Sequence, residues 1–179
     1  MKTEQRNTQI IFEYDTDMKK KYLHRIIWDE KKERATVIML SAGSSKGVYF
    51  DRTTCNVLRN LMNLGFGSAD IVNLFPEIGN GKLVTSNSED AENTKQIEKS
   101  VECADKIIYA VGTGHKTNKA VRKRAKTVIE IITKYAKKCY CISDSKGQLF
   151  YHPLCPKVWD WKLVPLPFKQ LVKEVSEQW

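Results

Sequence analysis

Asn73 is the first residue of this chain whose type and position favour chemistry. It stands near the end of a short apolar run, ADIVNLF at residues 69–75, where a side-chain amide has few polar neighbours. A primary amide offers one acceptor and two donors, which match the N3–H and O4 of a uracil ring. Asn73 is therefore a candidate for base recognition. The structural alternative is that its amide caps a strand end or ties down a loop.

His152 is the second candidate, because Pro153 follows it and restrains its backbone away from the helical region. Leu154 comes next in the chain. A stiff loop that presents an imidazole and then an apolar side chain suits stabilisation of a developing anion beside a wedge that enters a base stack. A His-Pro pair is also compatible with a plain turn, so both interpretations are open.

A loop of small and polar residues follows the apolar run VIML at residues 37–40. Glycine lets the backbone approach a ligand closely, while serine and lysine offer donors to a phosphate or a base. The loop lacks the G-x-x-x-x-G-K-[ST] spacing of a Walker A motif, and a plain β–α connection is the alternative. Its candidate binding residues are Ser41, Gly43, Ser44, Ser45 and Lys46.

A basic segment follows the third apolar run of the chain. His115 comes after Gly-Thr-Gly where a helix is expected to begin, so it is either a phosphate contact or an ordinary cap. The first half of the helix that follows is basic and holds no acid. It either tracks a DNA backbone or forms a solvated face. The candidates in this segment are Lys116, Lys119, Arg122 and Lys123.

The hydrophobic pattern predicts the elements that position these residues. Short buried strands are expected over residues 36–40, 69–75, 106–111 and 139–143, and helices over residues 51–64, 88–101, 117–138 and 168–178. Asp51 is the expected N-cap of the first helix. We expect a three-layer α/β/α fold with a central, mostly parallel four-stranded sheet and an N-terminal β-hairpin from residues 10–14 and 22–28. The carboxyl ends of parallel strands share one edge, so the candidates should meet there.

Composition narrows the class of partner. The 179 residues suit a single domain, and the net charge of +9 favours an acidic partner such as nucleic acid or an anionic membrane surface. No apolar run approaches the ~20 residues of a spanning helix, and the N-terminus MKTEQRNTQ does not resemble a signal peptide, so we expect a cytoplasmic protein. The five cysteines lack paired C-x-x-C spacing, so we expect no metal site and no cofactor.

Four motifs carry a resemblance to a known family. IMLSAGSSKGVYFDRTT, IVNLF, AVGTGH and YHPLCP occur in the order and spacing of the bacterial domain-of-unknown-function family 1643, and the resemblance covers roughly residues 22–165. The Asn73 and His152 motifs and the Asp51-x-Thr53 element match that family. The first loop departs from it, with Ser41 and Ala42 where Asn-Pro is usual and Lys46 where Asp is usual.

The layout of that family is similar to the uracil-DNA glycosylase superfamily. The similarity implies that residues 41–46 lie beside the scissile bond and that Asn73 recognises uracil. It also implies that the His152-Pro153-Leu154 motif contacts uracil O2 and the minor groove, with an apolar wedge nearby. Such an enzyme flips its target base out of the stack and needs an oriented water. The first loop holds neither Asp nor Asn, so Asp51 is the substitute candidate, although N-capping explains it equally well.

The sequence therefore predicts a DNA-binding, uracil-DNA glycosylase-like protein that excises uracil by N-glycosidic bond hydrolysis, with weak activity. Two alternatives are open. The first is a non-catalytic module of the same fold that binds DNA or an acidic protein that mimics DNA. The second is an enzyme that processes a nucleotide at the same edge of the sheet. The expected partner is DNA, including uracil-containing DNA, and no membrane.

Overall fold

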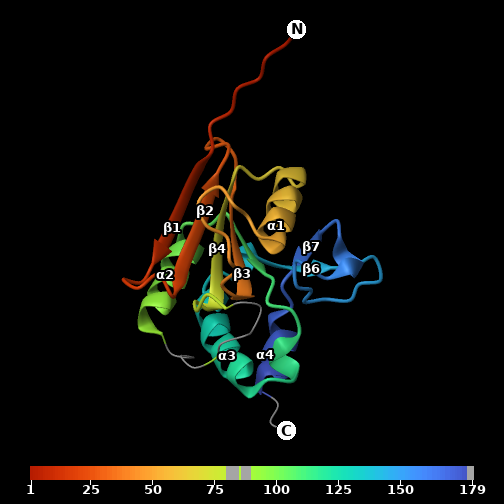
Figure 1. The fold of residues 1–179 in the computed structure, drawn as a ribbon. Helices are drawn as coiled ribbons and strands as arrows, with labels where there is room; N and C mark the ends of the chain where they lie inside the picture. The colour runs from red at the N-terminus through yellow and green to blue at the C-terminus, as the bar shows by residue number, and fades with distance from the viewer. Residues whose placement is uncertain (80–84, 86–89, 177–179) are drawn as a thin grey trace.

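A single mixed sheet organises the structure, a computed structural model that describes residues 1–79, 85 and 90–176. The strand order is β1-β2-β4-β3-β5-β6-β7 (Figure 1). The strands are β1 (Gln9–Tyr14), β2 (Lys21–Ile27), β3 (Arg34–Ser41), β4 (Ser68–Phe75), β5 (Lys106–Tyr109), β6 (Cys139–Ser143) and β7 (Lys162–Pro165). The helices are α1 (Arg52–Asn63), α2 (Ala91–Glu102), α3 (Lys119–Thr133) and α4 (Phe168–Ser176), with short 3₁₀ turns η1 (Gly114–Lys116), η2 (Ala136–Lys138) and η3 (Pro156–Val158).

The expected α/β class and the parallel core are confirmed, whereas the expected extent of the sheet is wrong. Strands β4, β3, β5 and β6 are mutually parallel. The hairpin continues this sheet because β2 pairs antiparallel with β4, and β7 adds an antiparallel edge strand to β6, which makes seven strands. The sequence does not predict β7, because this strand has only four residues and ends in Pro165. Proline in a strand is found mainly at the edge of a sheet, which is where β7 lies.

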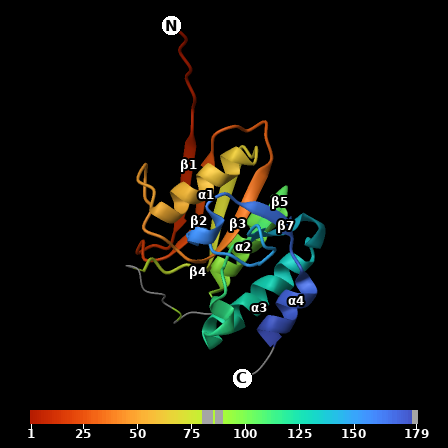
Figure 2. The ribbon, with the colours of Figure 1, turned by 90° about the vertical axis from the view of Figure 1, so that its right-hand side faces the viewer.

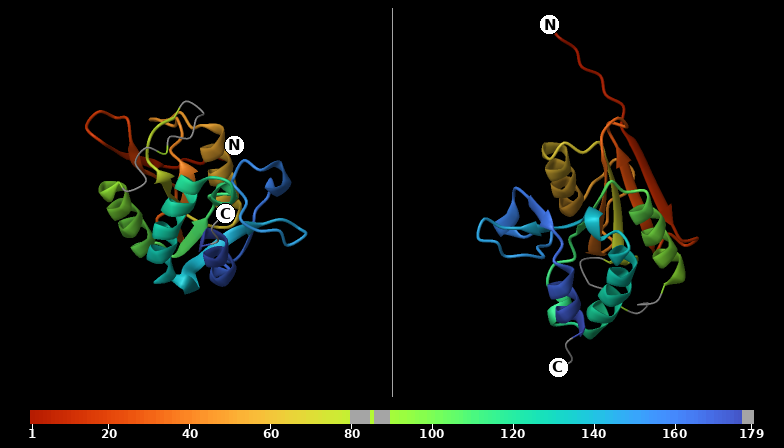
Figure 3. Two further views of the ribbon diagram at one scale, coloured as in Figure 1. Left: turned by 90° about the horizontal axis from the view of Figure 1, so that it is seen from below. Right: turned by 180° about the vertical axis from the view of Figure 1, so that it is seen from behind.

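The helices lie on both faces of the sheet. Figure 1 shows α1 and α2 on opposite sides of it, and Figure 2 shows α1 in front of the strands. One buried apolar cluster joins α1 to one face, through Val57, Leu58 and Leu61 against Val37 and Ile71. The other cluster joins α2, α3 and α4 to the opposite face. In both views of Figure 3 the helices α3 and α4 lie side by side.

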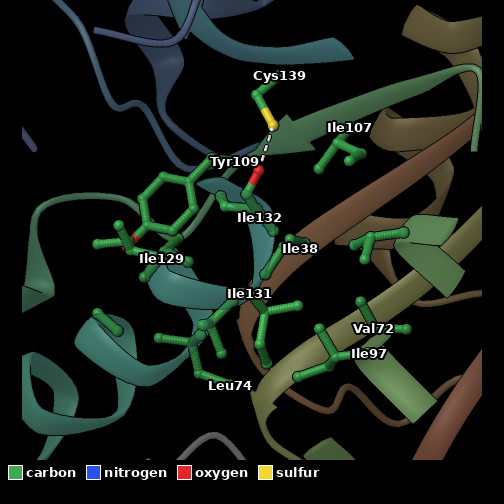
Figure 4. Packing of buried hydrophobic residues seen from close by; sticks show 14 of the residues in the cluster. Ile38, Val72, Leu74, Ile97, Ile107, Tyr109, Ile129, Ile131, Ile132 and Cys139 are labelled. Atoms are coloured by element: carbon green, nitrogen blue, oxygen red, sulfur yellow. Dashed lines mark hydrogen bonds between the residues drawn. The ribbon is translucent and has the colours of Figure 1, made fainter. Parts of the chain in front are cut away.

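The cluster under α2, α3 and α4 is closely packed (Figure 4). Ile38, Val72 and Ile107 of the sheet contribute to it together with Ile97 of α2 and Ile132 of α3. Cys139 lies in the same cluster, and its thiol donates to the backbone oxygen of Ile132 at 3.5 Å. Burial raises the pKa of this thiol to about 12, so it stays protonated and behaves as a small apolar side chain.

Local capping explains where the helices begin. Asp51 accepts a hydrogen bond from the backbone N–H of Thr54, which confirms it as the N-cap of α1. Asp90 caps α2 by accepting from Asn93, and α2 begins at Ala91; residues 86–89, where the expected helix began, lie outside the described part. Asn118 caps α3 by accepting from Ala120 and Val121, so α3 begins at Lys119, and it ends at Thr133 rather than at the expected residue 138. In the described part of the chain, no helix combines the length and apolar character needed to cross a membrane.

Candidate functional site

The first loop starts where β3 and β4 end together. Ser41 pairs with Phe75 in the parallel ladder, and Ala42 donates to the backbone oxygen of Phe75 at 3.1 Å. Within the loop, Ser41 and Gly43 are half-buried, whereas Ser44 and Lys46 are exposed. The loop therefore begins at the carboxyl edge of the sheet, as the sequence predicted, and its tip faces solvent.

Asp51 and Ser45 anchor this loop to α1. The Oδ2 atom of Asp51 accepts from the Ser45 hydroxyl at 2.8 Å and from the Ser45 backbone N–H at 3.2 Å, while Oδ1 accepts from the Thr54 N–H at 2.9 Å. Burial alone raises the pKa of Asp51, but these hydrogen bonds outweigh it and hold the pKa below its ordinary value. A Cβ on Gly43 would lie 2.2 Å from Oδ2, so any other residue there would displace the Asp51 carboxylate from these hydrogen bonds.

Both oxygens of the Asp51 carboxylate are thus occupied by hydrogen bonds that shape the loop and cap the helix. These hydrogen bonds show that Asp51 positions the first loop relative to α1. A general base needs a lone pair directed at a water molecule, and with two hydrogen bonds to Oδ2 and one to Oδ1 only one acceptor position, on Oδ1, is left for that role.

A β-bulge brings two buried basic side chains under the same loop. Leu23 pairs with Glu13 but the next pair is Lys21 with Tyr14, so Tyr22 is an extra residue in β2. Because side chains alternate along a strand, the extra residue turns Lys21 and His24 to the same face. Ile26, two residues after His24, belongs to the apolar cluster under α1, so this is the α1 face.

Lys21 is 3% exposed, and its Nζ donates to the backbone oxygen of Ser45 at 2.7 Å. Burial lowers the pKa of Lys21 to about 8, although the Asp51 carboxylate acts in the opposite direction. The imidazole of His24 stacks on Phe12 with ring centres 4.2 Å apart. Burial and then the charge of Lys21 lower the pKa of His24 to about 3, so the ring is neutral. Its buried Nε2 has no hydrogen-bond partner among the described residues.

Asn73 lies on the same face, one strand away. His24 pairs with Ile71 of β4, and Asn73 follows Ile71 by two residues. Because side chains alternate along a strand, the side chain of Asn73 lies on the same side of the sheet as that of Ile71. The Asn73 side chain is 3% exposed, and its buried Oδ1 has no hydrogen-bond partner within the described residues. The alternative role of Asn73, as a cap or a loop tie, would need a hydrogen bond to its side-chain oxygen. The hydrogen bond seen here is to its backbone oxygen, which accepts from Asn93 Nδ2 at 3.0 Å.

His152 lies beyond the carboxyl end of β5, against Gly112. A Cβ on Gly112 would lie 3.2 Å from that of His152, and the φ of +79° at Gly112 also favours glycine. Nδ1 of His152 accepts from the Leu154 N–H at 3.2 Å, which places the proton of the neutral ring on Nε2. Burial lowers the pKa of His152, so the ring is a neutral donor at neutral pH.

The loop that carries His152 is held on α1. Pro153 is buried, and its backbone oxygen accepts from Nδ2 of Asn56, one of the buried residues of α1. Strand β3 lies between β4, which carries Asn73, and β5, and His152 lies against Gly112 just beyond the end of β5. No hydrogen bond joins the two side chains in the described part of the chain. The first loop and the His152 segment thus lie at the edge of the sheet where β4, the strand of Asn73, ends.

The basic segment divides into buried and exposed residues. His115 is completely buried, and its Nε2 lies 2.9 Å from the Glu174 carboxylate of α4. It therefore belongs to the junction of η1, α3 and α4 and cannot contact a phosphate on the surface. Arg122 donates to the His115 backbone oxygen at 3.0 Å. Lys116, Lys119 and Lys123 are exposed, with the Lys116 ammonium 3.3 Å from Glu174.

Lys21 and His24 are the residues that sequence reasoning missed. Neither is among the candidates that the sequence predicts, and the expected hairpin strand begins at residue 22, one residue after Lys21. The signal in the sequence is that two basic side chains fall in a run that becomes β2, an interior strand of the sheet whose side chains are largely buried. In the described residues, no group of three or more His, Cys, Asp or Glu side chains could hold a metal ion.

Comparison with known proteins identifies one family. The model of the DUF1643 family, described as a protein of unknown function, matches residues 21–154. This range begins at Lys21 and ends at Leu154, so it includes all the side chains described above at the carboxyl edge of the sheet. No curated protein and no solved structure matches the chain.

Proposed function

This chain belongs to the DUF1643 family, and we propose that it binds DNA and holds an extruded uracil-type base at the carboxyl edge of its sheet. We further propose that it hydrolyses the N-glycosidic bond of that nucleotide, with weak activity. The unused amide oxygen of Asn73 carries this proposal. A buried acceptor without a donor costs about 1–3 kcal/mol. The N3–H of uracil supplies such a donor, and the amide N–H of Asn73 then matches O4.

His152 supports the chemical part of the proposal. Cleavage leaves negative charge on the departing base, and a preorganised donor stabilises that charge most where water is excluded. The Leu154 N–H occupies Nδ1, so Nε2–H is the donor available to the base. A neutral imidazole suits this role because its proton stays on the ring throughout.

Asn73 is only 3% exposed, so a base reaches it only when a neighbouring segment moves. We propose that this segment is the first loop, which Ser45 ties to Lys21 and Asp51. Opening the loop breaks these contacts, and base extrusion adds a cost of a few kcal/mol. Both costs act against fast turnover.

The engagement of Asp51 favours a second candidate function. Because each of its oxygens accepts hydrogen bonds from the loop or the helix, Asp51 is poorly placed to activate water. A module that binds DNA, or an acidic protein that mimics DNA, through the same edge needs no such water. The net charge of +9 and the exposed Lys119 of α3 serve either function.

Cleavage of a uracil-containing oligonucleotide tests the proposal. The DNA is incubated with protein, treated with alkali to break abasic sites, and compared with the same sequence carrying thymine. We expect slow cleavage at uracil only, and loss of cleavage in Asn73→Ala and His152→Ala. Binding without cleavage, with a steep salt dependence, would establish the non-catalytic module instead. Failure to bind either DNA at low salt would refute both.

A further inference from the structure

A surface groove lies between α1 and the segment that follows His152. It encloses a hollow of about 150 Å³ with mainly apolar walls. Drug-sized ligands occupy pockets of about 300–1,000 Å³, so this hollow suits a single planar ring. Its lining includes Arg52, Cys55, Arg59, Leu154, Cys155 and Trp159. Figure 1 shows the segment between β6 and β7, which carries the second wall, beside α1.

Two buried asparagines, one helical turn apart, hold the groove in shape. Asn56 donates to the backbone oxygen of Pro153. Asn60 donates to the backbone oxygen of Trp159 at 3.2 Å, and its Oδ1 accepts from the Trp161 N–H at 2.8 Å. Both ends of the second wall are therefore tied to α1, and the groove exists before any ligand arrives.

The indole of Trp159 is an exposed aromatic surface in the groove. The side chain is 58% exposed, and the Arg59 guanidinium lies 4.3 Å from its ring centre. Arg59 also pairs with Asp160 at 2.8 Å, which offsets its charge. Arg52, which also lines the groove, is exposed, so the rim carries a positive charge that no ion pair offsets among the described residues. An exposed aromatic ring with a positive rim is complementary to a base and its phosphate.

We propose that this groove holds one unpaired DNA base, stacked on Trp159, next to the site of the extruded nucleotide. Leu154 separates the two positions, since it is 42% exposed, lines the groove and follows His152 by two residues. The inference rests on the proposed function to the extent that the chain binds DNA. The groove would be a second base site, which binds a base by stacking. Stacking does not depend on which base is bound, and this site takes no part in catalysis.

Binding of single-stranded oligothymidylate, which contains no uracil, tests the second site. We expect Trp159→Ala to weaken binding about tenfold at low salt, as expected for loss of one stacked base. Met62→Ala is the matched control, because Met62 is 49% exposed on α1 but does not line the groove. On an oligonucleotide of the same length with abasic sugars, Trp159→Ala and wild type should bind equally.

Two exposed cysteines provide a second readout on the unmodified protein. Cys55 lines the groove, whereas Cys103 lies at the end of α2. Bound oligothymidylate should slow alkylation of Cys55 and leave Cys103 unchanged. If wild type binds DNA but Trp159→Ala binds equally and Cys55 is not protected, the second site is refuted and a different occupant, such as a peptide segment, becomes the explanation. If wild type does not bind DNA, the proposed function itself fails.

Discussion

Replacing Asn73 with leucine should stabilise the protein while removing its function. The buried Oδ1 of Asn73 has no donor within the described residues, and an unsatisfied buried acceptor costs about 1–3 kcal/mol. Leucine has the same branched shape and the same number of side-chain heavy atoms, and it carries no polar atom. We therefore expect the free energy of unfolding to rise by about 1 kcal/mol, which corresponds to a Tm increase of about 2–4 °C for a chain of this size.

The same substitution at Asn60 is the matched control. Asn60 is also buried, but its amide is bonded at both ends: Nδ2 donates to the backbone oxygen of Asn56 at 2.9 Å, and Oδ1 accepts from the Trp161 N–H at 2.8 Å. Asn60→Leu removes these hydrogen bonds and should lower the free energy of unfolding by about 1–3 kcal/mol. The two variants should thus shift stability in opposite directions.

Urea unfolding followed by circular dichroism measures both shifts, and binding to uracil-containing DNA measures the function. The expected result for Asn73→Leu is a higher unfolding midpoint with an unchanged m-value and no preference for uracil over thymine. A loss of more than about 1 kcal/mol in Asn73→Leu would show that the amide supports the fold. Undiminished preference for uracil would show that the base is recognised elsewhere.

Two further predictions concern the loop and the residues beneath it. The pKa of His24 is lowered to about 3, so its stabilising contribution is complete above its unfolded value of about 6.5 and is lost as the pH falls towards 3. Between pH 7 and pH 5, wild type should lose about 2 kcal/mol more unfolding free energy than His24→Leu, and parallel pH profiles would contradict this. Gly43→Ala places a Cβ 2.2 Å from Asp51 Oδ2 and should cost about 1–3 kcal/mol by thermal unfolding. Gly114→Ala, whose Cβ would make only ordinary contacts at 3.7 Å and beyond, should shift stability by less than about 1 kcal/mol, and equal effects of the two variants would refute the clash.

Local patterns in the sequence were sufficient for much of the framework. The four parallel strands follow from short apolar runs, because a strand covered on both faces must be apolar throughout. Asp51 could be identified as an N-cap because capping depends on residues within one helical turn. The meeting of the loops after β3, β4 and β5 at one edge follows from parallel strands alone.

The tertiary structure alone decided which of the candidate side chains are available. From the sequence, His115 is either a phosphate contact or an ordinary cap, whereas in the structure it is buried with its Nε2 2.9 Å from the carboxylate of Glu174, 59 residues away. The bulge at Tyr22 places Lys21 on the same face of the sheet as His24. A bulge depends on how two strands pair and not on the composition of either strand. The sequence by itself thus determined the strands, the caps and the shared edge. Burial and strand register, which arise from contacts between distant segments, decided what lies at that edge.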